Sequence, residues 1–147
     1  SAASDVYKRQ ECVYPLPHAE EVCRALVEQG HLLYIVTNAV ASVQRSRLKG
    51  SVFSRLITDA FISEDAGASK PDPAYYDYVR RRLPGMTAEN CLVIGDSLAT
   101  DIRGANNGGL DCIWYNPKGE KKPEDLKITL DARNFEEIYS FLTKECL

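Results

Sequence analysis

The chain has 147 residues, of which 44% are hydrophobic and 27% are charged, as is usual for one soluble domain with a single core. The net charge of −3 provides no basic field that would attract nucleic acid or an anionic membrane. No apolar run approaches the length of a membrane span, and no signal-peptide pattern occurs. We therefore expect neither nucleic acid nor a membrane as a partner.

Residues 1–10 show no helical or strand periodicity and contain no initiator methionine. They resemble a translated adapter tail of the kind that ends reading frames in environmental DNA assemblies. We therefore exclude them from the expected fold as a non-native tail. The natural sequence is expected to begin near Glu11, and residues 11–147 form the one expected domain.

Helical and strand patterns alternate along the rest of the chain. Helices are expected over residues 18–29, 41–49, 73–83, 100–107 and from Asn134 onward, and strands over residues 32–36, 60–62, 91–94, 111–115 and 127–130. The run over residues 32–36 is apolar without interruption, which is typical of a parallel strand buried on both faces. The predicted fold class is α/β, a Rossmann-like three-layer parallel sheet.

Two helix starts have clear local signals. Asp72 is suited to cap a helix whose first residue is Pro73. Asn134 and Glu137 have the spacing of a capping box.

The cysteines are few and unpatterned. There are five of them, an odd number, with no CxxC or Cys/His pairing. Three lie in apolar segments, where a reduced cysteine behaves as a small hydrophobic residue. This usage favours a reducing cytoplasm.

Polar residues stand at or after the predicted strand ends. Thr37 follows one strand, Lys70 lies in the turn before a helix, and Asp96 and Asp101 follow the strand over residues 91–94. Ligands of open α/β sheets bind at the carboxyl ends of the strands. Two carboxylates there suggest a hard cation, most simply Mg²⁺. Each residue alone also has a simpler explanation, as a locally satisfied threonine, a solvated lysine or an ordinary loop.

Taken in chain order, these residues resemble the motifs of the haloacid dehalogenase superfamily of hydrolases. Val36-Thr37-Asn38 is similar to its second motif and Lys70-Pro71 to its third. The segment from Gly95 to Asp101, followed by Ile102-Arg103-Gly104-Ala105, is similar to its fourth. The resemblance spans roughly Tyr14 to Leu142.

The resemblance implies a Mg²⁺-dependent phosphatase and a role for each residue. Thr37 would bind a phosphate oxygen, and Lys70 would stabilise the charge of the phosphate and of the nucleophile. Asp96 would ligate Mg²⁺ directly. Asp101 would act from the second shell or through a water molecule.

A narrower resemblance is to the 5′-nucleotidase branch. It rests on Tyr14-Pro15-Leu16-Pro17, on Ile35 to Asn38 and on Val43 to Leu48. It implies a nucleoside monophosphate as the substrate, with Asn38, Gln44, Arg45 and Arg47 as candidate contacts. The alternative for the two arginines is an ordinary solvated helix face. The exact substrate and the oligomeric state stay open.

The first motif of the family, an apolar strand that ends in Asp-x-Asp, is not found. Asp5 lies in the excluded tail without a preceding strand, and Asp59 and Asp65 come too late in the chain. The helical cap expected before Thr37 is missing too. The chain is therefore predicted to be the C-terminal part of a longer hydrolase, inactive by itself. Its two central strands should either close up or leave the sheet unstable, because their backbone groups lose partners.

Other classes of protein fit less well. The second interpretation is a non-catalytic relative of the hydrolases that binds phosphorylated ligands. A receiver-like signalling domain would need strand-end acids before Thr37, and none occurs. Neither GxxxxGK[ST] nor GxGxxG is present, which argues against a P-loop enzyme and a dinucleotide-binding fold.

Overall fold

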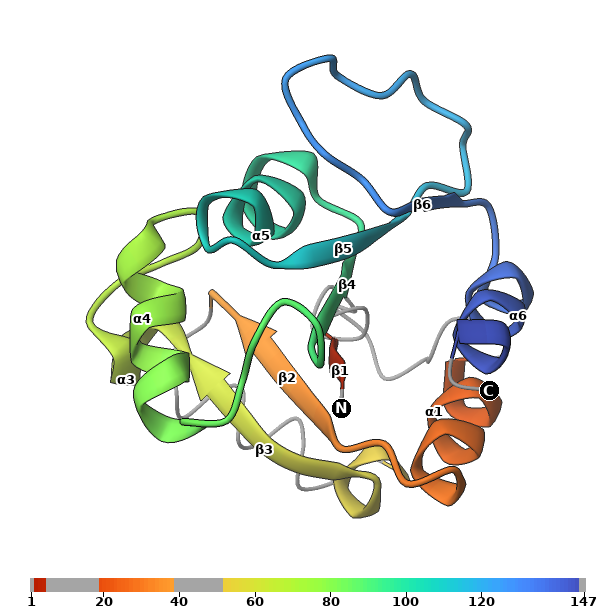
Figure 1. The fold of residues 1–147 in the computed structure, drawn as a ribbon, viewed down its shortest axis with the longest axis horizontal. Helices are drawn as coiled ribbons and strands as arrows, with labels where there is room; N and C mark the ends of the chain where they lie inside the picture. The colour runs from red at the N-terminus through yellow and green to blue at the C-terminus, as the bar shows by residue number, and fades with distance from the viewer. Residues whose placement is uncertain (1, 5–18, 39–51, 146–147) are drawn as a thin grey trace.

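The computed structural model describes residues 2–4, 19–38 and 52–145, and they form a six-stranded sheet in the order β3-β2-β1-β4-β5-β6 (Figure 1). All neighbouring strands are parallel. The strands are β1 (Ala2–Ser4), β2 (Leu33–Thr37), β3 (Ile57–Ile62), β4 (Leu92–Gly95), β5 (Asp111–Tyr115) and β6 (Leu130–Ala132).

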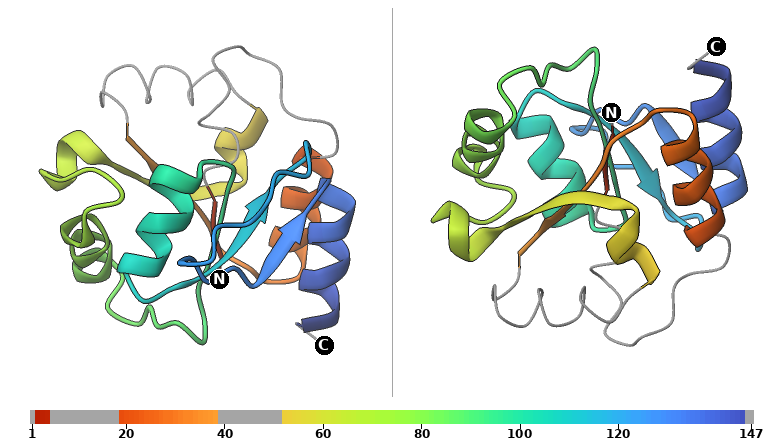
Figure 2. Two further views of the ribbon diagram at one scale, coloured as in Figure 1. Left: turned by 90° about the horizontal axis from the view of Figure 1, so that it is seen from above. Right: turned by 90° about the horizontal axis from the view of Figure 1, so that it is seen from below.

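Helices cover both faces of the sheet and complete three layers, as the sequence predicted (Figures 1 and 2). They are α1 (Ala19–Glu28), α3 (Ser63–Ala66), α4 (Pro73–Arg82), α5 (Arg103–Asn107) and α6 (Phe135–Glu145). One apolar core lies under α4 and α5 and includes Tyr75, Tyr76 and Trp114. The other lies under α1 and α6 and includes Leu26 and Ile138. Within the described ranges, no helix is both long and apolar enough to cross a membrane.

The predicted elements agree with the structure except at the sheet edges and in the helix predicted over residues 100–107. There α5 begins only at Arg103, after a π-helical turn over Leu98–Ile102. The predicted helix over residues 41–49 lies outside the described residues. The strand at residues 60–62 is longer, because β3 begins at Ile57 and exposes Thr58 and Asp59 at the sheet edge. The prediction of a strand over residues 127–130 is wrong except at its last residue, since β6 is Leu130–Ala132.

Both predicted helix caps are confirmed. The Asp72 carboxylate accepts a hydrogen bond from the Ala74 N–H at 2.9 Å, and Pro73 is the first residue of α4. The Asn134 side chain accepts one from the Glu137 N–H at 2.9 Å. The Glu137 carboxylate reaches back one residue further than a standard capping box, to the N–H of Arg133 at 2.9 Å.

The cysteines that the structure describes are buried and reduced. Cys23, Cys91 and Cys112 form no disulfide. Burial raises the pKa of Cys23 and of Cys112 to about 11. Both therefore stay protonated at neutral pH and pack as small apolar groups.

The centre of the sheet differs from the prediction. Excluding residues 1–10 from the fold was wrong for residues 2–4, which form β1 between β2 and β4. Ala3 pairs with Tyr34 on one side and with Val93 on the other. The two inner strands therefore neither close up nor face an empty position. Parallel neighbours supply the hydrogen bonds that this short segment of small residues needs to be a strand. Its origin as a non-native tail stays a prediction.

The pairing of β1 can be tested with a proline. We expect Ala3→Pro to lower the free energy of unfolding by about 1–3 kcal/mol, because proline removes a backbone donor from a strand that is bonded on both sides. Chemical denaturation of both proteins gives the difference. A chain that begins at Glu11 should be destabilised more strongly. Equal stability of all three proteins would mean that residues 2–4 do not belong to the sheet.

Candidate functional site

The carboxyl ends of β2 and β4 meet at the side chain of Lys70. β2 ends at Thr37, β4 ends at Gly95, and Lys70 lies in the turn that leads into α4. The Lys70–Pro71 peptide bond is cis. The sequence predicted that these polar residues would gather at one edge of the sheet, and the structure brings Thr37, Lys70 and Asp101 together as buried side chains.

Lys70 forms a buried ion pair with Asp101. The Lys70 ammonium donates to Asp101 Oδ1 at 2.6 Å and to the main-chain oxygen of Val36 at 3.0 Å. Both charged side chains have no solvent exposure. Charges in such a setting must be paired and hydrogen-bonded, because the loss of hydration is costly. The pair therefore ties the β2 end, the turn before α4 and the loop after β4 together.

Asn38 holds the backbone of Lys70. Its amide donates to the main-chain oxygen of Lys70 at 2.8 Å and accepts from the Lys70 N–H at 2.9 Å. Both ends of this amide are thus used within the protein. The geometry gives Asn38 a positioning role and does not place it with a ligand, although the resemblance suggested a substrate contact. Gln44, Arg45 and Arg47 lie outside the described residues.

A π-helical turn over residues Leu98–Ile102 directs Asp101 inward. The N–H groups of Asp101 and Ile102 both donate to the main-chain oxygen of Ser97, at 2.9 and 3.0 Å. Asp101 Oδ2 accepts from the Ser97 N–H at 3.1 Å. Both carboxylate oxygens of Asp101 therefore have partners within the protein. Such turns are frequent at functional sites.

Gly95 leaves the space that this carboxylate fills. A Cβ atom at position 95 would lie 2.5 Å from the Asp101 Cβ and 2.6 Å from its Oδ2. Real Cβ atoms do not approach so closely, so any side chain here would displace Asp101.

Thr37 is held by Tyr75. The Thr37 N–H donates to the Tyr75 hydroxyl at 3.1 Å, and that hydroxyl donates to the main-chain oxygen of Phe61 on β3. Thr37 is 1% exposed, and its own hydroxyl forms no hydrogen bond to a described residue. This hydroxyl is therefore available to a ligand.

Asp96 differs from Asp101 in its surroundings. It is half-buried, directly after β4, and its main-chain oxygen accepts from the Trp114 indole N–H at 3.2 Å. Burial first, and then the charge of Asp96, raise the pKa of Tyr115. Asp96 therefore lies near Tyr115, the last residue of β5.

Comparison with known proteins identifies the family. The family of haloacid dehalogenase-like hydrolases matches residues 2–109. The chain belongs to this family.

Two curated relatives show how much of a haloacid dehalogenase-like hydrolase is present. The HAD-hydrolase YfnB of Bacillus subtilis is 41% identical over 119 residues, which are 81% of this chain and 51% of YfnB. The pyrimidine 5′-nucleotidase PynA of Streptococcus pneumoniae is 33% identical over 90% of this chain and 56% of its own length. The chain therefore spans about half the length of these relatives.

A solved structure of YfnB gives the same result for the fold. It superposes with a TM-score of 0.80 and 38% identity, over 86% of this chain and 55% of YfnB. That crystal structure is described as bound to magnesium.

The side chains in place fit a Mg²⁺ ion of this family only in part. Among the described residues, no group of three or more acidic, histidine or cysteine side chains could hold a metal. Asp96 can provide one carboxylate ligand. Asp101 is already bound to Lys70 and Ser97. Mg²⁺ prefers six oxygen ligands in octahedral geometry and often takes only one or two from carboxylates. The resemblance left two roles open for Asp101, in the second shell or through a water molecule. The geometry favours the second shell, where Asp101 does not touch the metal itself.

Sequence reasoning missed two contributors to the site. Tyr75 lies within the helix predicted over residues 73–83, where the sequence pattern gives it no role beyond the inner face of that helix, but its hydroxyl bridges β2 and β3. The Val36 main-chain oxygen accepts from Lys70, and main-chain acceptors leave no signal in a sequence. For Tyr75 the available signal was its hydroxyl, because the hydroxyl of a buried tyrosine needs a hydrogen-bond partner.

The ion pair can be tested by a double-mutant cycle. We expect Asp101→Leu to lower the free energy of unfolding by about 3–5 kcal/mol, because it leaves the Lys70 charge buried without its acid. Lys70→Met should have a similar effect. The double variant should be clearly more stable than the sum of the two losses predicts. Additive losses in urea denaturation would mean that the two charges do not stabilise each other.

A second test concerns the space at Gly95. We expect Gly95→Ala to cost about 1–3 kcal/mol of stability, since the new methyl group displaces the Asp101 side chain. Gly85→Ala is the matched control, because a Cβ at position 85 meets nothing within 4 Å. Thermal denaturation compares the two. A stable Gly95→Ala protein with an unperturbed Lys70 would contradict the packing described.

Proposed function

We propose that the intact protein is a Mg²⁺-dependent phosphomonoester hydrolase that acts on nucleoside 5′-monophosphates through an aspartyl-phosphate. The observation that carries this proposal is the Lys70 ammonium, fixed between Asp101 and the main-chain oxygen of Val36, the residue before Thr37. Phosphoryl transfer depends on positioned charge more than on any other contribution, and a lysine held rigidly at strand ends provides it.

Each residue then has a defined task. The Thr37 hydroxyl donates a hydrogen bond to a phosphate oxygen. The Lys70 ammonium offsets negative charge on the phosphate and the nucleophile. Asp101 keeps Lys70 charged and oriented, and Asn38 fixes its backbone. Asp96 would provide the protein's carboxylate ligand to Mg²⁺. When bound, the ion neutralises phosphate charge and aligns the nucleophile with phosphorus.

The substrate class rests on the relatives. PynA and YjjG of Escherichia coli, which is 28% identical, both carry the name pyrimidine 5′-nucleotidase. A phosphoserine phosphatase of Thermus thermophilus is 30% identical. All three names describe enzymes that act on phosphomonoesters. A phosphomonoester substrate is therefore better supported than a nucleotide in particular. Buried reduced cysteines support placing the enzyme in the cytoplasm.

The printed chain by itself is proposed to be inactive. The only aspartate before Thr37 is Asp5, which lies outside the described residues. The interpretation that no strand precedes it is wrong, since β1 ends at Ser4. The Asp-x-Asp pattern is still incomplete, because Val6 and Tyr7 follow. The second acid normally transfers protons, and without it turnover should be negligible.

The test is a phosphate-release assay on the purified chain, with Mg²⁺ and either uridine or cytidine 5′-monophosphate. We expect no release above that of Lys70→Met, and only weak Mg²⁺ binding in calorimetry. Turnover that Asp5→Asn abolishes would contradict the proposed inactivity.

The intact gene provides the second part of the test. The upstream reading frame should encode an apolar strand ending in Asp-x-Asp and then a cap. The longer protein should hydrolyse these nucleotides with Mg²⁺ and lose activity in Asp96→Asn. A start codon close upstream would instead favour the non-catalytic binding module.

A further inference from the structure

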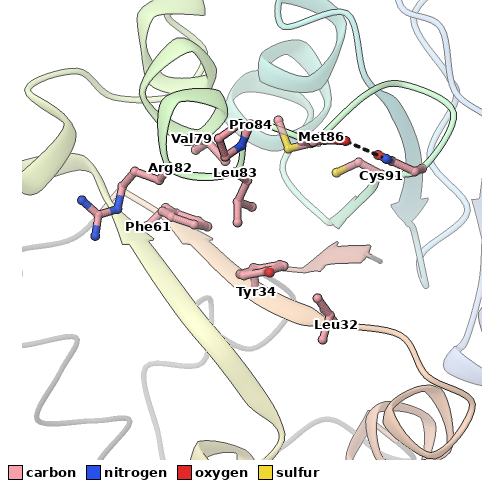
Figure 3. Close-up of a pocket in the computed structure, with 11 residues that line it drawn as sticks. Leu32, Tyr34, Phe61, Val79, Arg82, Leu83, Pro84, Met86 and Cys91 are labelled. Atoms are coloured by element: carbon pink, nitrogen blue, oxygen red, sulfur yellow. Dashed lines mark hydrogen bonds between the residues drawn. The ribbon is translucent and has the colours of Figure 1, made fainter.

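A pocket of about 280 Å³ lies under the C-terminal end of α4, against the beginnings of β2 and β4 (Figure 3). Tyr34 is the second residue of β2, and Cys91 directly precedes β4. Thr37 and Asp96 stand at the other ends of these two strands. With about 3.3 Å per residue, the three residue steps from Tyr34 to Thr37 span about 10 Å. The pocket is therefore separate from the candidate site.

The interior of the pocket is apolar and partly aromatic. Tyr34 and Phe61 form one wall, with ring centroids 5.6 Å apart. Leu83, Met86 and Cys91 form the opposite side. Leu32, at the edge, is 48% exposed, which is unusual for a large apolar side chain. These walls suit a flat hydrocarbon or aromatic group.

The hydroxyl of Tyr34 is a polar group of the pocket lining. Tyr34 is 7% exposed and lines the pocket, and no hydrogen bond joins its hydroxyl to a described residue. Burial first, and then the charges of Asp59 and Cys91, raise the pKa of Tyr34. The hydroxyl therefore keeps its proton at neutral pH. The hydroxyl oxygen itself is not among the buried side-chain atoms that lack a partner, so it reaches solvent and can donate to a ligand in the pocket.

Among the described residues that line the pocket, Arg82 is the only one with a formal charge. Its guanidinium lies at the outer edge of the pocket, beyond Phe61, and 5.8 Å from the centre of the Tyr78 ring (Figure 3). No acidic side chain among the described residues pairs with it. Asp59, the acid paired with Tyr34 in strand register, is exposed and accepts from the Ala60 N–H at 2.7 Å. Arg82 is therefore the group of this rim that can attract an anion.

The pocket is formed before any ligand binds. The Asn90 amide donates to the main-chain oxygen of Gly85 at 2.7 Å, and its oxygen accepts from the Thr87 N–H at 2.8 Å. These bonds fix the loop that carries Met86. The Arg80 guanidinium donates to the main-chain oxygen of Gly108 and so attaches the end of α4 to the end of α5. A preformed pocket loses little free energy to ordering when it binds.

We propose that this pocket binds a small aromatic carboxylate, with its ring between Tyr34, Phe61 and Met86 and its carboxylate near the Tyr34 hydroxyl and Arg82. The volume agrees with this class of ligand. An apolar cavity of about 150 Å³ holds benzene, so about 280 Å³ accommodates a ring with a short acidic chain.

Met86 makes the test specific, because it is the single methionine of the chain and lies in the pocket. Methyl-labelled methionine therefore gives one NMR signal that reports on this site. Titration with 3-phenylpropionate should shift that signal to saturation, with a Kd on the order of 1 mM or below for a ligand of this size. Its neutral isostere 3-phenylpropanamide should bind about two- to fivefold more weakly, because a charge at the rim has a modest effect.

Three variants separate the contributions. Arg82→Gln should remove the preference for the acid over the amide. Arg81→Gln is the matched control, because Arg81 is the neighbouring exposed arginine outside the pocket, and it should keep that preference. Tyr34→Phe keeps the ring and should weaken both ligands. An unchanged melting temperature shows that each variant is folded.

Three results would overturn the proposal. The first is a Met86 signal that does not shift saturably with the acid. The second is equal affinity of the native chain for acid and amide. The third is binding to Tyr34→Phe that equals binding to the native chain. None of these results depends on phosphatase activity, so the test is independent of the function proposed for the other edge of the sheet.

Discussion

The buried pair of Lys70 and Asp101 is the constraint on which the candidate site depends. Two charged groups without solvent exposure are tolerated only with close pairing and further hydrogen bonds. Lys70 meets this condition through Asp101 and the Val36 oxygen, and Asp101 through Lys70 and the Ser97 N–H. Three segments that are distant in the chain must therefore be placed together before either charge is stable.

This constraint also divides the work between the two aspartates of the loop after β4. Asp101 is committed to the protein, and Gly95 has no side chain because that carboxylate occupies the space. Asp96, half-buried at the strand end, is left as the carboxylate that can meet a cation. Two acids five residues apart thus have different chemistry, because one faces the core and the other faces the edge of the sheet.

The centre of the sheet shows where a pattern in the sequence is too short to be informative. The segment Ala2–Ser4 has only three residues, all with small side chains, and so lacks the length and the large apolar residues of a typical buried strand. They form one because β2 and β4 both present backbone donors and acceptors to the position between them. At β6, pairing with β5 decided the strand in the same way, and the predicted strand lay too early in the chain.

The sequence by itself determined the α/β class, the bounds of β5, both helix caps and the chain order of Thr37, Lys70, Asp96 and Asp101. These features follow from local periodicity and neighbouring side chains, which a single sequence contains. Only the tertiary structure decided that Lys70 pairs with Asp101, 31 residues away, that Asn38 holds Lys70, and that Tyr75 supports Thr37. Such partners depend on how strands and turns pack in space, and spacing along the chain does not specify that packing.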